Sequence, residues 1–191
     1  NSKIKRIIDF STAFGPSGME DEVSSLAMED VKDICEVHDD TMRNTYMHFK
    51  QDKEHETTIL LDAHADEVGF IVQAIKPNGT IRFLPLGGWD PKNIVSGEVW
   101  ILNDKGEKIS GIVASQPVHF LSEEKRNGKV DFDDLVIDVG ATSVQEVKEE
   151  FHISVGNFMC PAVTCKYDEA HKIFLGKAFD CRIGCAAVMD V

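Results

Sequence analysis

The sequence is poor in positive charge, lacks paired cysteine motifs and contains no long apolar run. Lysine and arginine together number 20 in the 191 residues, against 33 aspartates and glutamates, so the formal net charge is −13. Because binding to nucleic acids and anionic membranes depends largely on positive charge, this deficit argues against both kinds of partner. No apolar run approaches the roughly 20 residues that a transmembrane helix needs.

Cysteine usage points to a reduced environment. The chain contains five scattered cysteines and no CxxC pair. An odd number without paired spacing predicts free thiols in a cytoplasmic protein, and argues against a disulfide scaffold or a structural zinc site. Apolar residues make up 42% of the chain and charged residues 28%, which is typical of a globular protein of one large or two small domains.

The first third of the chain predicts two helices, a hairpin and a buried strand. Apolar residues at helical spacing predict a helix over residues 2–14. Ser17 stands three residues before Glu20, the spacing of a capping box, and predicts the start of a second helix. Residues 35–49 indicate two short strands joined by a turn. The continuous apolar run at 57–61 predicts a strand buried on both faces.

The pattern becomes β-rich after Val68. Turn sequences separate five segments with strand character, at residues 68–75, 80–84, 94–103, 107–114 and 134–139. A second capping-box spacing, from Ser143 to Glu146, predicts a short helix. Residues 161–175 then indicate a hairpin. An apolar helix over 181–189 follows, and it is expected to continue past Val191 because no stop signal closes it.

Two places in the sequence carry candidate chemistry. His64 and Asp66 follow the predicted strand two residues apart, so their side chains are expected on one face. A carboxylate beside an imidazole commonly orients a metal-binding histidine, although a hydrogen-bonded surface histidine explains the same pattern. Asp180 precedes the last helix, where it could be a metal ligand or a helix cap. Cys181 beside it reads as a packed thiol. Spacing alone leaves these alternatives open.

Several segments, in this order, resemble the dinuclear metalloaminopeptidases that include the glutamyl, deblocking and tetrahedral aminopeptidases. The segments are Ser17–Glu20, Ala63–Phe70, Pro85–Pro91, Ala114–Leu121, Ile137–Ala141 and Gly176–Cys185. The resemblance covers nearly the whole chain. It implies an α/β fold in which an aminopeptidase-type catalytic domain, at residues 1–68 and 161–191, is interrupted by an inserted β-rich, barrel-like assembly domain at residues 69–160.

The resemblance also assigns roles by position. It implies that His64 is a ligand of one metal and that Asp66 is the catalytic acid that orients the His64 imidazole. It also implies that Asp180 bridges two divalent ions, zinc or cobalt. Cys181 stands where the family often has a second aspartate. The implied partners are peptide substrates and further copies of the chain in a homo-oligomer such as a dodecamer, in the cytoplasm.

The remaining ligands and the general base are expected after Val191, so a polypeptide of residues 1–191 alone is expected to be inactive. Two other interpretations compete with a metal-dependent aminopeptidase. One is a non-catalytic assembly or binding module that carries half of a metal site. The other is a glycoside hydrolase with paired carboxylates, although no acidic pair here has a motif context that selects that chemistry.

Overall fold

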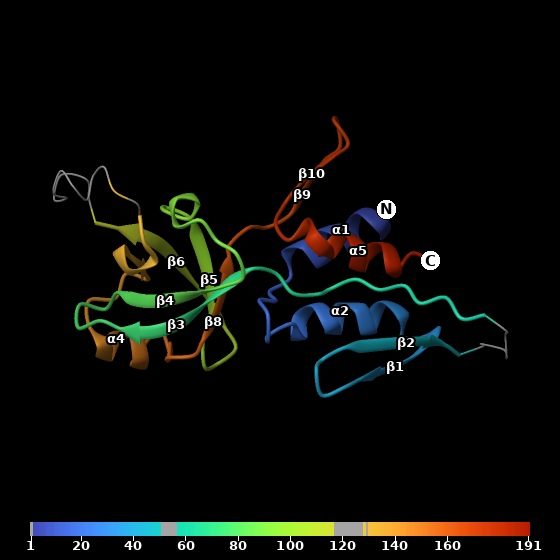
Figure 1. The fold of residues 1–191 in the computed structure, drawn as a ribbon, viewed down its shortest axis with the longest axis horizontal. Coiled ribbons are helices and arrows are strands. Elements are labelled where there is room, and N and C mark those ends of the chain that lie inside the picture. Colours follow the sequence, from blue (N-terminus) through green and yellow to red (C-terminus); the bar gives the residue numbers. More distant parts are fainter. Residues whose placement is uncertain (1, 51–56, 117–127, 129) are drawn as a thin grey trace. The chain divides into compact units, whose positions relative to one another are not determined.

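The computed structural model describes residues 2–50, 57–116, 128 and 130–191. The chain divides into two compact units (Figure 1). The split unit consists of residues 1–67 and 164–191, and the barrel unit consists of residues 68–163. Among the described residues, no helix is long and apolar enough to cross a membrane.

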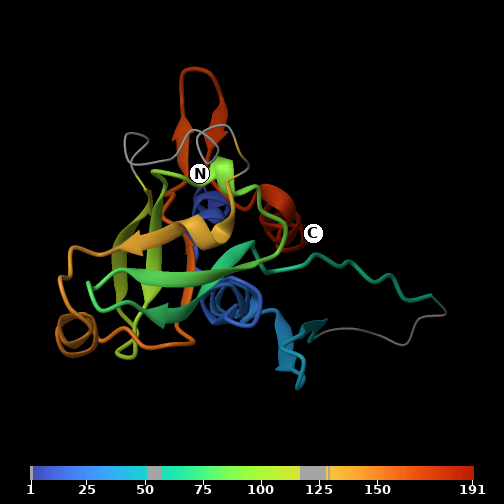
Figure 2. The same ribbon diagram turned by 60° about the vertical axis from the view of Figure 1, so that its left-hand side comes forward.

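The barrel unit is a closed antiparallel barrel of six strands. In barrel order, its strands are β3 (Gly69–Ile75), β4 (Ile81–Leu86), β7 (Leu135–Asp138), β6 (Lys108–Ser115), β5 (Glu98–Leu102) and β8 (Phe158–Pro161). Closure pairs β8 with both β3 and β5, so the barrel has no free edge. The strands curve around one interior (Figure 2). Short helices connect them: η1 (Pro91–Asn93), η3 (Phe132–Asp134) and α4 (Val144–Glu149).

The barrel interior holds the largest apolar core of the described residues. Alternate strand residues point inward, and Ile81, Ile101 and Ile137 are fully buried there. Trp89 closes one part of this core, because its indole donates a hydrogen bond to the Gly69 carbonyl at 3.0 Å. Pro85–Pro91, which carries part of the family resemblance, therefore contains a structural tryptophan.

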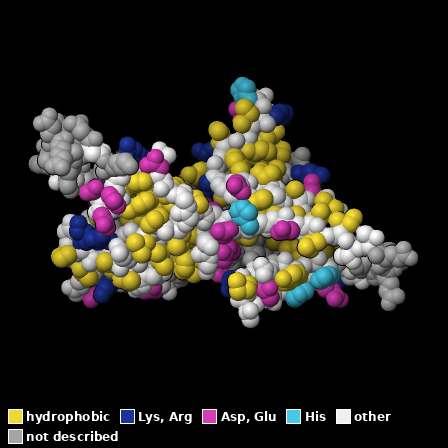
Figure 3. All heavy atoms as spheres, in the orientation of Figure 1, with side chains coloured by type: hydrophobic (Ala, Val, Ile, Leu, Met, Phe, Trp, Pro, Cys, Tyr) yellow, Lys and Arg dark blue, Asp and Glu magenta, His cyan; other side chains and the backbone are white. Residues whose placement is uncertain are grey.

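The split unit contains three longer helices and two hairpins. Its elements are α1 (Ser2–Thr12), α2 (Asp21–Val31), β1 (Cys35–Asp39), β2 (Thr45–Phe49), β9 (Lys166–Asp168), β10 (Ile173–Leu175) and α5 (Phe179–Val188). Helix α5 packs along α1, and apolar residues of α1, α2 and α5 form one core. The β9–β10 hairpin exposes Ile173 and Leu175. Figure 3 shows hydrophobic side chains gathered over this hairpin.

The predicted strand at 57–61 is wrong. These residues are extended but pair with no strand among the described residues, and the Ile59 and Leu60 side chains are each 82% exposed. An apolar run becomes a buried strand only when neighbouring strands satisfy its backbone and cover its faces. The segments that lead to His64 and Asp180 therefore share no sheet here, because β10 pairs only with β9 in the described chain.

The predicted cap of the second helix also needs correction. Helix α2 begins at Asp21, and no side chain caps it; the Glu20 carboxylate instead accepts a hydrogen bond from the Gly18 backbone at 2.7 Å. Helix α5 ends at Val188, where the Met189 amide still bonds to the Cys185 carbonyl.

Other local predictions are confirmed. The Ser143 hydroxyl accepts a hydrogen bond from the Glu146 amide and caps α4, as the capping-box spacing predicts. The Glu146 carboxylate, however, bonds to Thr142 and not to Ser143. The five β-rich segments correspond to β3, β4, β5, β6 and β7. Residues 117–121 of the Ala114–Leu121 motif lie outside the described residues.

Candidate metal centre

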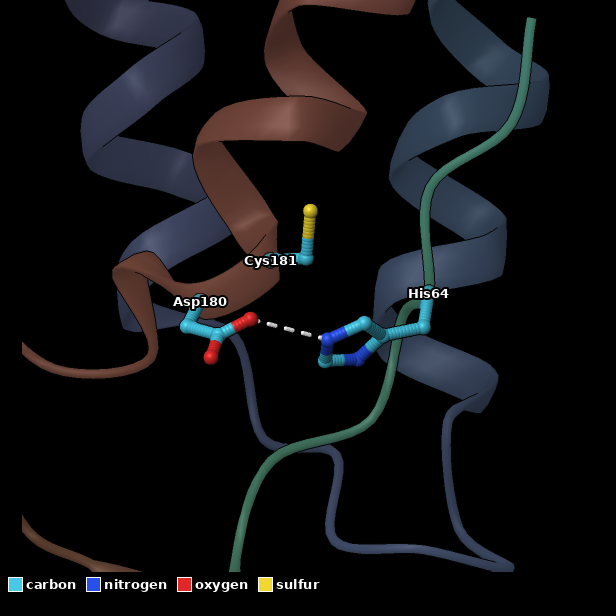
Figure 4. A group of neighbouring side chains, drawn as sticks. All are labelled: His64, Asp180 and Cys181. Carbon is cyan, nitrogen blue, oxygen red and sulfur yellow. Dashed lines mark hydrogen bonds and ion pairs between the residues drawn. The ribbon is translucent and has the colours of Figure 1, made fainter.

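The structure brings together the three site residues that the sequence predicts. His64 lies in the irregular segment before Glu67, and Asp180 lies at the start of α5. The His64 ring is held between two carboxylates: Nδ1 lies 3.0 Å from Asp66 Oδ1, and Nε2 lies 3.0 Å from Asp180 Oδ1. Figure 4 shows the contact between His64 and Asp180, with Cys181 beside it. Residues 116 positions apart in the sequence therefore meet at one imidazole.

Both ring nitrogens of His64 face negative charge, which changes its protonation. The hydrogen bond to Asp180 raises the pKa of the His64 imidazole above 6.5; burial opposes this rise, and the Asp66 carboxylate adds to it. Without a metal, a protonated ring donates to both carboxylates, whereas a neutral ring donates only once. A cation bound at Nε2 would take the place of the proton that faces Asp180.

The available donor atoms suit a divalent metal ion. The ligand atoms of His64, Asp180 and Cys181 all lie within 4.8 Å of one another. Because bonds to zinc measure about 2.0–2.3 Å, the ligands of one ion can lie at most roughly 4.6 Å apart, close to this spacing. Imidazole, carboxylate and thiolate donors together suit zinc and cobalt better than magnesium or calcium. Within the described part of the chain, no other group of three such side chains has this geometry.

Asp66 and Asp180 differ in what they can do. Asp66 faces Nδ1, the position of a carboxylate that fixes the orientation of a metal-bound imidazole. The Asp180 side chain is 94% exposed, so its second oxygen is open to a further ligand. Asp180 does not act as a helix cap, because the hydrogen bond of its carboxylate in the described structure goes to His64 and not to a backbone amide of α5.

Helix α5 approaches the His64 segment closely because Gly184 has no side chain. A methyl group at Gly184 would overlap with Cys181 Sγ and lie 3.1 Å from Ala63 Cβ. One residue further along α5, the Cys185 thiol donates a hydrogen bond to the His64 carbonyl at 3.3 Å. Helix α5 thus carries Asp180 and also holds the backbone of His64.

Three charged residues near this site were missed by sequence reasoning. Glu67 directly follows Asp66, while Lys177 and Arg182 flank Asp180, and all three are buried. The sequence presents Glu67 only as one acid in a polar cluster, and nothing in its spacing indicates burial. The one sequence feature that could have drawn attention to these three residues is their position: they lie in the segments Ala63–Phe70 and Gly176–Cys185, which also contain the candidate ligands.

Comparisons with known proteins identify the family of the chain. The sequence profile of the M42 glutamyl aminopeptidases matches residues 44–191. This chain belongs to that family. It is 33% identical over 149 residues to the lysyl aminopeptidase of Pyrococcus furiosus, a match that covers 76% of this chain and 41% of the relative. The family and the α/β fold with a barrel are therefore as the sequence predicts.

Solved structures support the same assignment. The TET aminopeptidase of Thaumarchaeota archaeon SCGC AB-539-E09 is 34% identical, with a TM-score of 0.91, over all of this chain and 53% of that chain. The TET1 peptidase of Pyrococcus horikoshii can assemble into a tetrahedron or a large octahedral shell. It is 26% identical to this chain, with a TM-score of 0.84, and the match covers 98% of this chain and 55% of that chain. The chain spans about half the length of these M42 proteins.

Proposed function

We propose that this M42 chain provides part of the active site of a metal-dependent aminopeptidase, which removes N-terminal residues from peptides at a dinuclear metal centre. The observation that carries the proposal is the His64 ring held between Asp66 and Asp180. Its support comes from the family and from relatives that are themselves aminopeptidases.

Each residue has a distinct proposed role. His64 would hold one ion through Nε2, and Asp66 would accept a hydrogen bond from Nδ1–H and fix the ring. Asp180 would hold both ions, since one oxygen faces His64 and the other is open. When bound, two divalent ions such as zinc or cobalt lower the pKa of a water molecule and polarise the scissile carbonyl.

The described residues do not complete such a centre. His64 and Asp180, even with Cys181, give at most one set of about three protein ligands, enough for one catalytic ion and not for two. They also offer no separate carboxylate to act as general base. Because the chain spans about half the length of its relatives, we place the remaining ligands and the general base outside residues 1–191.

We also propose a division of labour between the two units. The split unit carries the metal centre, and the barrel unit serves assembly into a homo-oligomer. Support for assembly comes from the TET1 peptidase of Pyrococcus horikoshii, which forms closed shells and has a similar structure over 98% of this chain.

The proposal is tested on the full-length protein loaded with zinc or cobalt. Metal content is measured by mass spectrometry, and activity is measured as the release of a chromogenic amine from aminoacyl substrates. His64→Ala and Asp180→Ala should abolish turnover, with the larger loss of metal in Asp180→Ala. Asp62→Asn is the matched control, because this exposed carboxylate lies two residues from His64 and should be dispensable.

Three results would contradict the proposal. Full activity with two metals per subunit in Asp180→Ala would remove the bridging role. An intact protein that forms shells but turns over no peptide would favour the assembly module. Release of reducing sugar from a glucan, without peptide hydrolysis, would favour the glycoside hydrolase.

A further inference from the structure

Three charged side chains are buried together in the split unit, next in sequence to the proposed ligands. The side chains of Glu67, Lys177 and Arg182 are 3%, 6% and 0% exposed. Lys177 Nζ lies 2.7 Å from Glu67 Oε1, and Arg182 Nη2 lies 3.7 Å from the same oxygen. We call these three residues the buried ion network. Because apolar side chains would fill this space at no desolvation cost, stability alone gives little reason for the network.

Arg182 joins α5 to the end of α1. Its Nη1 donates to the carbonyls of Phe10 at 2.8 Å and Ala13 at 3.2 Å, and its Nη2 donates to that of Gly15 at 3.2 Å. The Phe10 and Ala13 carbonyls lie at the C-terminal end of α1, where the helix dipole favours a cation, and Gly15 lies in the segment that follows. Gly15 leaves room for the guanidinium, since a Cβ there would lie 2.7 Å from Arg182 Nη2.

Glu67 fixes the segment that carries His64. Its backbone amide donates to the Gly15 carbonyl at 2.9 Å, and its side chain reaches Lys177. The Gly15 carbonyl therefore accepts hydrogen bonds from both Glu67 and Arg182. The segment that ends in Asp66 and the helix that begins near Asp180 share this one anchor.

Lys177 fixes the entry to α5. Its carbonyl accepts a hydrogen bond from the buried Ser11 hydroxyl at 2.6 Å, while its ammonium pairs with Glu67. The next residue, Ala178, has a φ of 52°, a left-handed conformation that a non-glycine residue adopts only when its surroundings hold it. This turn directs the chain toward Asp180. In the sequence, Asp180 lies between Lys177 and Arg182, two residues of the buried ion network.

We propose that the buried ion network positions Asp180 against His64, so that its three residues are positioning residues of the metal centre. The inference rests on the proposed function. Glu67 is central to it, because its carboxylate pairs with Lys177 and lies 3.7 Å from the Arg182 guanidinium. Removing that charge should separate the segments on which His64 and Asp180 lie, although Glu67 itself touches neither side chain in the contacts described.

The test uses the full-length protein and cobalt as the probe. Glu67→Gln keeps the shape of the side chain and removes its charge. Cobalt affinity is measured by titrating the visible d–d absorption, which reports ligand geometry, and is expected to fall about 10- to 100-fold, with an altered spectrum. The kcat value should fall with little change in KM. Asp30→Asn is the control: it breaks the Asp30–Arg6 pair of the same unit and should leave the spectrum unchanged.

A double variant separates positioning from stability. Glu67→Gln with Lys177→Met removes both partners of the pair, so the urea midpoint should return toward that of the wild type. Cobalt affinity should nevertheless stay low, because the side-chain pair that joins the two segments is then absent. Recovery of both properties would overturn the proposal, and so would a Glu67→Gln protein that is less stable but has a wild-type affinity and spectrum.

A second variant and a crystal structure complete the test. If Glu67→Gln does not fold, Lys177→Met alone, which leaves Glu67 with Arg182, takes its place with the same expected loss of affinity. If the wild-type protein neither binds cobalt nor turns over peptide, the proposed function fails. A crystal structure of metal-free Glu67→Gln then tests the positioning: the His64–Asp180 hydrogen bond should be lost, and its retention at 3.0 Å would overturn the proposal.

Discussion

Gly184→Ala tests how closely α5 must approach the His64 segment. The added methyl group would overlap with Cys181 Sγ and lie 3.1 Å from Ala63 Cβ, where carbon atoms prefer about 3.5–4.0 Å. Cys181 can rotate, but Ala63 can only move with its backbone, by about half an ångström. Overpacking of this kind costs about 1–3 kcal/mol. Since alanine is favoured over glycine in a helix by about 1 kcal/mol, we expect a net loss of about 1 kcal/mol.

The same displacement should weaken metal binding, because Ala63 adjoins His64. A ligand shifted by about half an ångström is outside the tolerance of a preorganised site, so zinc affinity should fall about tenfold. Urea unfolding of the metal-free, full-length protein measures the first effect, and competition with a chromogenic chelator measures the second. Gly88→Ala is the matched control, since a Cβ at Gly88 meets nothing within 4 Å. A Gly184→Ala protein with wild-type stability and zinc affinity would refute the close approach.

Three further predictions concern other parts of the chain. Asp66→Asn should raise the zinc dissociation constant about tenfold by chelator competition, because the neutral amide holds the His64 ring less firmly; an unchanged constant would contradict the orienting role. Hydrogen bonds from Ser154 and Asn157 lower the pKa of Asp104 below 3.8, so the stability that this carboxylate adds is present above pH 3.8 and lost as pH falls through its folded pKa. Urea unfolding should therefore show wild type and Asp104→Asn converging in acid, and a constant difference would contradict this. Residues 1–191 alone should release no amine from aminoacyl substrates even with added zinc or cobalt, whereas turnover near that of the full-length protein would show that the missing ligands lie within them.

Features set by local interactions could be predicted from the sequence. The apolar spacing before Thr12 gave helix α1, and the Ser143 hydroxyl caps α4 as its motif predicts. His64, Asp66 and Asp180 could be selected as candidates because each lies in a short motif that resembles those of the family, and the structure brings the three side chains together. In each case, the residues that determine the feature lie within a few positions of one another.

Features that depend on distant partners could not be predicted. The apolar run at 57–61 has strand character but no partner strand among the described residues, so its pattern alone did not fix its structure. The burial of Glu67 depends on Lys177, 110 positions away, and on the carbonyls at the end of α1. No spacing rule links these positions, since only the folded chain brings them together.

The most direct test of the proposed metal centre is anomalous diffraction from crystals of the full-length protein with zinc. The proposal predicts two peaks about 3.5–4 Å apart, with His64 Nε2 on one and the Asp180 carboxylate touching both. Asp66 should remain hydrogen-bonded to His64 Nδ1. Two peaks elsewhere, or a catalytically active crystal form with no metal at His64 and Asp180, would contradict it.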